Sequence, residues 1–65
     1  ARTDDVLALQ HAWGRLSGRE RAVLTLRFHE GLPQGQVAER VRMSQMQVSR
    51  IQRRALQRLR AFMSE

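Results

Sequence analysis

The stretch Gln36-Val-Ala-Glu-Arg-Val-Arg-Met-Ser-Gln-Met-Gln-Val-Ser-Arg-Ile51 contains two helical patterns separated by a short turn. Ala38 belongs to the first pattern, and Val48 and Ile51 follow it in the second. A small residue lets two helices cross closely, and the apolar residues after the turn fill the angle between them. Only Arg42 to Ser44 separate the patterns, so the stretch predicts a helix-turn-helix over residues 33–60, the arrangement that places its second helix in the major groove of DNA.

The last helix is predicted from its cap and its apolar spacing. Ser44-Gln-Met-Gln47 is a capping box, and neither glycine, proline nor acid interrupts the chain from there to about Met63. One buried stripe, with spacings of 3 and 4, consists of Val48, Ile51, Ala55, Leu59 and Phe62. At about 100° per residue, the opposite face carries Met46, Ser49, Arg50, Arg53 and Gln57. This helix can therefore pack on one side and contact a ligand on the other.

Three more helices are predicted ahead of the turn. The first begins at about Asp4, Ser17-Gly-Arg-Glu20 forms a capping box that opens the second, and Gly31 closes the second. Pro33 has the fixed φ of a helix start, so the third runs from there to about Val41. The sequence thus predicts an all-α fold, a four-helix helix-turn-helix domain over residues 1–65. It is a short helical bundle with a C-terminal recognition helix.

Composition limits the class of protein. The chain has 65 residues and no cysteine, which predicts one small domain held by apolar packing alone. No apolar run approaches the roughly 20 residues that span a bilayer, and the polar start is not followed by the apolar segment of a signal peptide. We therefore expect a cytoplasmic protein with no membrane partner. The absence of an initial methionine is consistent with a piece of a longer protein.

Positive charge is concentrated at the C-terminal end. The chain has twelve arginines, six acids and no lysine, a net charge of +6. Residues 42–65 hold six of the arginines and only one acid. A basic half on a small domain favours nucleic acid as the partner, the alternative being a solvated helix face.

Catalytic and metal chemistry find little support in the sequence. His11 and His29 lie on different predicted helices and have no cysteine or nearby carboxylate set, so no metal site is expected. The serines have capping or groove positions and no neighbouring base. We expect a protein that is not an enzyme and has no cofactor.

Four blocks resemble region 4 of the sigma-70 family of RNA polymerase sigma factors. They are Leu16-Ser-Gly-Arg-Glu-Arg-Ala-Val-Leu-Thr-Leu-Arg-Phe28, Gln36-Val-Ala-Glu-Arg-Val41, Ser44-Gln-Met-Gln-Val-Ser-Arg50 and Arg54-Ala-Leu-Gln-Arg-Leu-Arg60. The third block is most similar to the stress-response and sporulation branch. The resemblance extends from about Asp4 to Arg60, and its weight comes from several blocks recurring in order.

The resemblance implies that the last helix recognises the −35 promoter element and that the domain acts in transcription initiation as part of a sigma factor. The family's base-reading positions fall on Gln45, Met46, Ser49 and Arg50. Glutamine pairs with adenine, arginine with guanine, and methionine can touch a thymine methyl group, although Met46 is equally suited to a partner protein. The family's phosphate positions fall on Arg19, Arg27, Gln34, Gln36, Arg53 and Arg54. The Arg58 and Arg60 end fits either phosphate contact or plain solvated surface.

The resemblance also implies docking to the β flap of RNA polymerase through an apolar cleft of the first helices. The residues expected there are Leu9, Trp13, Leu16 and Leu26. The first two predicted helices hold many large apolar residues for so small a domain, which favours an exposed patch over a core function alone. An anti-sigma factor or a transcription activator could compete for the same face.

The sequence departs from the family pattern in two places. Arg42 stands in the turn where the family commonly has glycine, and a left-handed arginine costs about 1–2 kcal/mol. Pro33 and Gly35 replace the usual polar cap and a polar residue at the start of the third helix. Two alternatives remain open from the residues. They are the DNA-binding output domain of a response regulator and a helical protein-interaction module.

Overall fold

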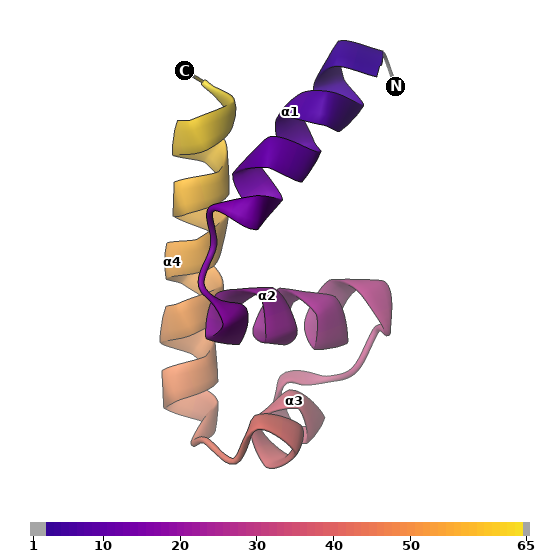
Figure 1. Ribbon diagram of the computed structural model, residues 1–65. Coiled ribbons are helices and arrows are strands. Elements are labelled where there is room, and N and C mark those ends of the chain that lie inside the picture. The colour runs from indigo at the N-terminus through magenta and orange to yellow at the C-terminus, as the bar shows by residue number, and fades with distance from the viewer. Residues whose placement is uncertain (1–2, 65) are drawn as a thin grey trace.

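Helices make up the fold of residues 3–64, which the computed structural model describes (Figure 1). They are α1 (Thr3–Gly14), α2 (Gly18–Leu24), α3 (Gln34–Val41) and α4 (Gln45–Met63), and α2 continues into the π-helical turn η1 (Thr25–His29). Residues 3–64 contain no strand, so the predicted all-α helix-turn-helix fold is confirmed. The first helix begins at Thr3, close to the predicted start, and the side chains before Val6 lie outside the described ones.

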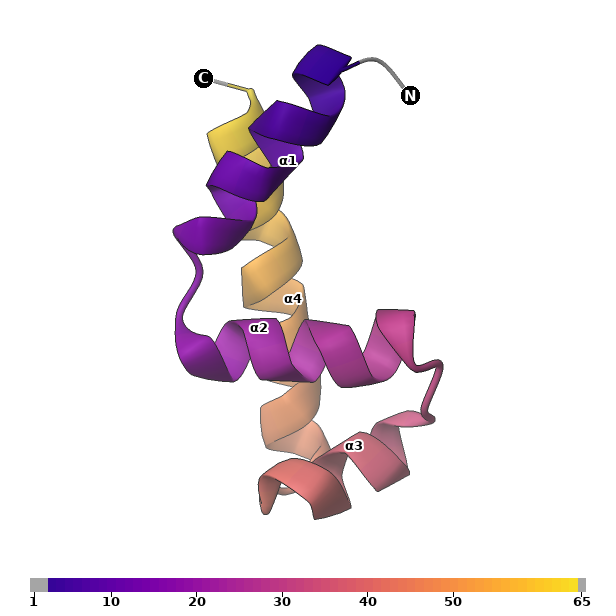
Figure 2. The ribbon, with the colours of Figure 1, turned by 45° about the vertical axis from the view of Figure 1, so that its right-hand side comes forward.

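The other helices pack along α4. In both ribbon views α1 lies beside the C-terminal half of α4, α2 crosses its middle, and α3 lies at its N-terminal end (Figures 1 and 2). The molecule is elongated along α4, with extents of 35 × 19 × 15 Å. Because α4 touches α1, α2 and α3, it fixes how the surfaces of the whole domain lie relative to one another.

Two predicted capping boxes start helices as expected. At α2, the Glu20 amide donates to Ser17 Oγ over 3.1 Å, and the Ser17 amide donates to Glu20 Oε1 over 2.9 Å. At α4, the Gln47 amide donates to Ser44 Oγ over 3.1 Å, and the Ser44 amide donates to Gln47 Oε1 over 3.0 Å. Each box satisfies two backbone donors that a helix start would otherwise leave open.

The turn between α3 and α4 is short and sharply bent. Arg42 has φ 57° and ψ 49°, the left-handed conformation that the family pattern had suggested for this position. The Met43 amide then donates to the Ala38 carbonyl over 3.0 Å, which closes the end of α3. Pro33 caps α3 in an extended conformation, so α3 begins one residue later than predicted.

The end of the second helix differs from the prediction. Residues 25–29 form a π-helical turn, in which the Glu30 amide donates to the Thr25 carbonyl over 3.0 Å. Gly31 closes the helix with φ 74°, as predicted. Val23 and Leu24 form a buried apolar stripe on this helix, but the side chain of Phe28 is 55% exposed. The buried stripe therefore stops before the end of this helix.

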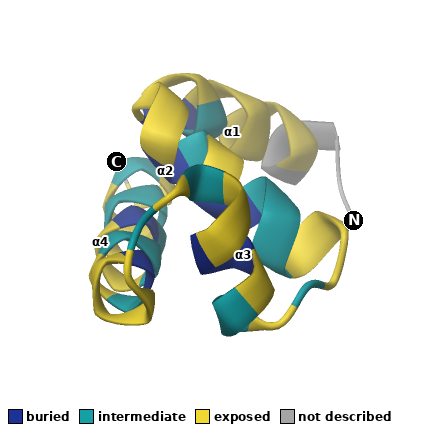
Figure 3. Cartoon of the chain, turned by 90° about the horizontal axis from the view of Figure 1, so that it is seen from below, coloured by how far each residue is buried: buried dark blue, intermediate teal, exposed yellow. Residues whose placement is uncertain are grey.

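The core consists of two apolar clusters along α4 (Figure 3). Val48 packs in the first with Val23 from α2 and Val37 and Ala38 from α3, and Ile51 and Met43 cover this cluster. Ala55 packs in the second cluster, which also contains the buried residues Leu16 and Leu24 and the partly buried residues Trp13, Leu56, Leu59 and Phe62. The first cluster holds the helix-turn-helix together, as predicted from Ala38, Val48 and Ile51, and the second holds α1 and α2 against α4.

Candidate nucleic-acid interface

The exposed face of α4 presents the residues expected to read bases. Gln45, Met46 and Arg50 are exposed, and Ser49 is partly buried. Met46 is 66% exposed, more than any other large apolar side chain among the described residues. The helix α4 begins directly after the turn, beside α3 at one end of the elongated domain (Figure 1), which is where a helix-turn-helix contacts a groove.

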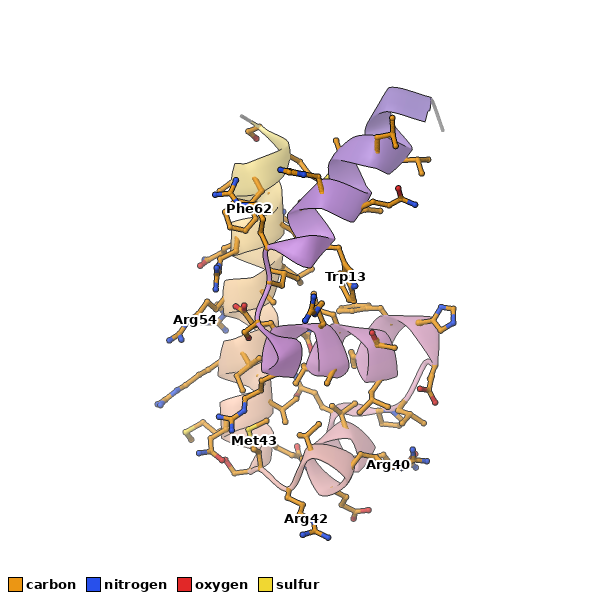
Figure 4. The ribbon with its side chains drawn as sticks, in the orientation of Figure 1. Trp13, Arg40, Arg42, Met43, Arg54 and Phe62 are labelled. Atoms are coloured by element: carbon orange, nitrogen blue, oxygen red, sulfur yellow. The ribbon has the colours of Figure 1, made fainter. Side chains whose placement is uncertain are left out.

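Three arginines meet between α2 and α4. A hollow of about 200 Å³ is lined by Arg19 of α2, by Arg50 and Arg54 of α4, and by Met43, Gln47 and Ile51. Figure 4 shows Arg54 projecting outward from α4. Arg19 and Arg54 were predicted to bind phosphate, whereas Arg50 was predicted to read a base. The structure thus brings residues of both predicted groups to one side of α4, where guanidinium groups from two helices can reach a single strand.

The remaining predicted phosphate residues are more scattered. Arg53 and Gln36 are exposed, and neither lines this hollow. Gln34 Nε2 donates to Gln52 Oε1 over 3.5 Å, so its amide links the start of α3 to α4. Arg27 is partly buried in η1, and its Nε atom is buried with no hydrogen-bond partner among the described residues.

Arg58 belongs to an ion pair inside the domain. Its Nη1 atom donates to Glu20 Oε1 over 2.9 Å, and Nη2 donates to the Arg15 carbonyl over 3.4 Å. Glu20 is only 5% exposed, and its Oε2 atom is buried without a partner among the described residues. Burial raises the pKa of Glu20, but the hydrogen bonds from Ser17 and the positive charge of Arg58 outweigh it and hold that pKa below its ordinary value.

The sequence left open whether Arg58 and Arg60 contact phosphate or are plain solvated surface. The ion pair gives Arg58 a structural contact inside the domain. Arg58 is bound to α2 and to the end of α1, and its guanidinium also lies 5.5 Å from the ring centre of Phe62. This pairing could not be predicted from the sequence, because Glu20 and Arg58 lie 38 residues apart in the chain. Arg60, in contrast, is exposed.

An apolar groove lies on another side of α4. It has a volume of about 600 Å³ and is lined by Leu9, Gln10, Trp13, Leu24, Thr25, Phe28, His29, Leu56 and Leu59. Figure 4 shows Trp13 between α1 and the second helix, where it also packs against the second core cluster. Leu9 and Trp13, two of the residues predicted for docking, therefore line one groove.

The other two predicted docking residues lie elsewhere. Leu16 is buried in the second core cluster, and Leu26 packs against the first cluster beside α3. Neither lines the groove, because the core takes the inner faces of α1 and α2. Leu56 and Leu59 of α4 complete the groove, and of these two Leu59 was predicted as part of the buried stripe of that helix. Both reach the groove because α1 lies beside the C-terminal half of α4.

Two other kinds of site are not found among the described residues. Among the described residues, no three of His, Cys, Asp and Glu gather where they could hold a metal ion. None of the helices in residues 3–64 combines the length and the apolar character needed to cross a membrane.

The geometry defines a helix-turn-helix DNA-binding domain, since α3 and α4 form the motif and α4 presents an arginine-rich face after the turn. The family model described as "Sigma-70, region 4" matches residues 12–61. The chain therefore belongs to region 4 of the sigma-70 family of RNA polymerase sigma factors. This assignment supports the sigma-factor interpretation over the response-regulator alternative.

Curated relatives agree with the family. The chain is 56% identical over 45 residues to RNA polymerase sigma factor SigF of Mycobacterium tuberculosis, which covers 69% of this chain and 17% of that protein. It is 37% identical over 59 residues to the RNA polymerase sigma-F factor of Bacillus subtilis, covering 91% and 23%. It is 42% identical over 53 residues to the sigma-G factor of the same organism, covering 82% and 20%. These relatives match the predicted stress-response and sporulation branch.

The chain spans about a fifth of the length of these relatives. No solved structure matches the chain.

Proposed function

We propose that this domain binds the −35 element of a promoter as part of a sigma factor that directs RNA polymerase. The observation that carries the proposal is the exposed face at the N-terminal end of α4. Directly after the turn of the helix-turn-helix, this face presents the exposed side chains of Gln45, Met46 and Arg50. These side-chain types read adenine, thymine and guanine edges in the major groove. In this proposal the domain is a cytoplasmic binding module without catalytic activity.

The hollow lined by Arg19, Arg50 and Arg54 supports contact with the DNA phosphate backbone, beside the face proposed to read bases. Arg19 comes from α2 and Arg54 from α4, so a strand that passes between these helices meets positive charge from both. Arg53 and the start of α3 at Gln34 and Gln36 would hold neighbouring phosphates. Phosphate contacts fix the orientation of a protein on the duplex, while contacts to base edges carry the sequence preference.

The test is duplex binding at several salt concentrations. We expect a linear fall of log affinity with log salt, with a slope of about −0.9 for each phosphate neutralised, and stronger binding to a −35 duplex than to a scrambled one. An affinity that does not change with salt concentration would contradict DNA binding. Equal binding to both duplexes would leave a basic domain without promoter recognition.

We further propose that the apolar groove docks the flap of the RNA polymerase β subunit. The support is a wide groove whose walls come from α1, the second helix and α4, with Leu9 and Phe28 exposed at it. A helix that lays an apolar face into such a groove buries surface that the domain alone leaves in water. An anti-sigma factor or an activator would compete for the same groove.

Chemical-shift mapping tests this second surface. A β-flap fragment is titrated into the isotopically labelled domain, and the shifted residues are located. We expect changes at Leu9, Trp13, Phe28, Leu56 and Leu59. Shift changes confined to the N-terminal half of α4, or no changes at all, would contradict docking of the flap in the groove.

A further inference from the structure

Gly35, the second residue of α3, leaves room for the side chain of Gln45, the first residue of α4. A Cβ atom at Gly35 would lie 3.1 Å from Gln45 Nε2 and 3.8 Å from Gln45 Cδ. The first distance is tighter than nine in ten of the contacts that Cβ atoms make in proteins. A Cβ atom at position 35 would therefore require the Gln45 amide to shift by a few tenths of an ångström.

The contact belongs to one edge of α4. Gln45 and Gln52 are seven residues apart, about two helical turns, so they share the edge that faces α3. Gln34 Nε2 donates to Gln52 Oε1 across the same boundary over 3.5 Å. The start of α3 thus meets α4 through two glutamine side chains, and Gln45 is the one beside the exposed face that carries Met46 and Arg50.

We infer that Gly35 is a positioning residue that sets where the Gln45 amide stands for base recognition. The inference rests on the proposed function, in which Gln45 reads a base edge. A glutamine that pairs with adenine must place both its nitrogen and its oxygen within hydrogen-bond distance and with good alignment. Its side chain has several rotatable bonds, and a Cβ atom at position 35 would crowd the one arrangement in which the amide lies over Gly35.

The chain offers a matched control for the substitution Gly35→Ala. Gly18, in the first turn of α2, would place a Cβ atom in open space, since nothing lies within 4 Å. Both glycines have φ values outside the left-handed region, and alanine favours a helix more than glycine does. Both Gly35→Ala and Gly18→Ala should therefore fold, and only the first should move Gln45.

The experiment measures affinity for −35 duplexes in which each base pair is changed in turn. The proteins are the wild type, Gly35→Ala, Gly18→Ala, Gln45→Ala and the double variant Gly35→Ala with Gln45→Ala. Loss of preference in Gln45→Ala identifies the base pair that this residue reads. At that base pair we expect Gly35→Ala to reduce discrimination at least about fivefold, the lower end for one well-made base contact. The double variant should lose no more than Gln45→Ala, and Gly18→Ala should behave as wild type.

Full discrimination by Gly35→Ala would overturn the inference while leaving the proposed function intact. An equal loss of affinity for every duplex when Gly35→Ala is made, both in the wild type and in Gln45→Ala, would also overturn it. Gly35 would then act through its own main chain and not through Gln45. A wild-type domain that binds all duplexes alike would instead overturn the proposed function and the inference together. The free domain gives a separate readout: the side-chain amide resonances of Gln45 should shift in Gly35→Ala and stay in place in Gly18→Ala, and unshifted resonances would refute the contact itself.

Discussion

Arg42 carries the conformational strain of the helix-turn-helix. Its left-handed backbone brings Cβ close to the following carbonyl oxygen, which costs about 1–2 kcal/mol for a residue other than glycine. The strain is retained because the conformation lets the Met43 amide reach the Ala38 carbonyl and lets α4 leave at the angle that the core needs. Figure 4 shows the Arg42 side chain projecting from this turn, so its charge is available although its backbone is strained.

Replacing Arg42 by glycine should stabilise the domain. The strain of about 1–2 kcal/mol is relieved, but glycine loses about 0.5–1 kcal/mol more conformational entropy on folding, so the net gain expected in the free energy of unfolding lies between about 0 and 1.5 kcal/mol. Arg40→Gly is the matched control, because it removes an exposed arginine from the regular part of α3 and should destabilise by about 1 kcal/mol. Urea unfolding of the three proteins gives the comparison. Equal destabilisation by both substitutions would show that the turn is not strained.

Arg50 and Arg53 are expected to act differently on DNA. Arg50→Ala should cost about 1–3 kcal/mol on the preferred −35 site and little on a scrambled duplex, as for a base contact. Arg53→Ala should weaken both duplexes alike and make the salt slope shallower by about 0.9. Arg60→Ala, with one charge removed about 15 Å further along α4 than Arg50, controls for the loss of net charge. Equal losses on both duplexes for Arg50→Ala would instead group it with Arg19 and Arg54 as a phosphate contact.

The ion pair of Glu20 and Arg58 ties one helix to another. Glu20 Oε1 accepts both from the Ser17 amide, which starts α2, and from Arg58 in the middle of α4. The same arginine donates to the carbonyl of Arg15, the residue after α1, so one guanidinium links α4 to α2 and to the turn that follows α1. A buried carboxylate that loses such partners is left with the cost of its burial.

The pKa of Glu20 makes this tie dependent on pH. Because that pKa is lower in the folded than in the unfolded domain, the stabilisation is complete above the unfolded value, near 4.5, and is lost as the pH falls through the folded value. Glu20→Gln keeps an acceptor for the Ser17 amide and removes the charge. It should lower the free energy of unfolding at pH 7 by about 1 kcal/mol, and the gap to wild type should close towards pH 3. A gap that stays constant from pH 7 to pH 3 would exclude Glu20 as the titrating group.

The sequence predicted the helices because their signals are local. The capping boxes at Ser17 and Ser44 and the spacing from Val48 to Phe62 each lie within one helix, where backbone geometry fixes which residues meet. The π turn at Thr25–His29 and the pairing of Glu20 with Arg58 were not predicted. Both depend on how distant segments pack, and neither residue type nor spacing specifies such contacts. For the same reason the sequence did not indicate that Leu16 is buried in the second core cluster or that Leu26 packs against the first.

The two candidate binding surfaces are carried by different parts of one molecule. The residues proposed to read bases lie on the first two turns of α4, whereas the groove is lined by Leu56 and Leu59 further along and by the N-terminal helices. Between the two regions α4 is held in the core by Ile51 and Ala55. A partner in the groove therefore has no direct contact with the DNA face, and each surface can be changed without the other.

This separation predicts that a groove substitution affects polymerase docking alone. Phe28→Ser removes an exposed aromatic ring from the groove and should weaken binding of a β-flap fragment about ten- to a hundredfold, as for the loss of a side chain worth about 1.5–3 kcal/mol on burial. Leu7→Ser is the control, because Leu7 is 57% exposed on α1, similar to Phe28, and does not line the groove. Affinity for the −35 duplex should be unchanged in both variants, since their side chains lie away from the DNA face. Flap binding that Leu7→Ser weakens as strongly as Phe28→Ser would assign docking to the outer face of α1, and a loss of DNA affinity in Phe28→Ser would show that the two surfaces are coupled through α4.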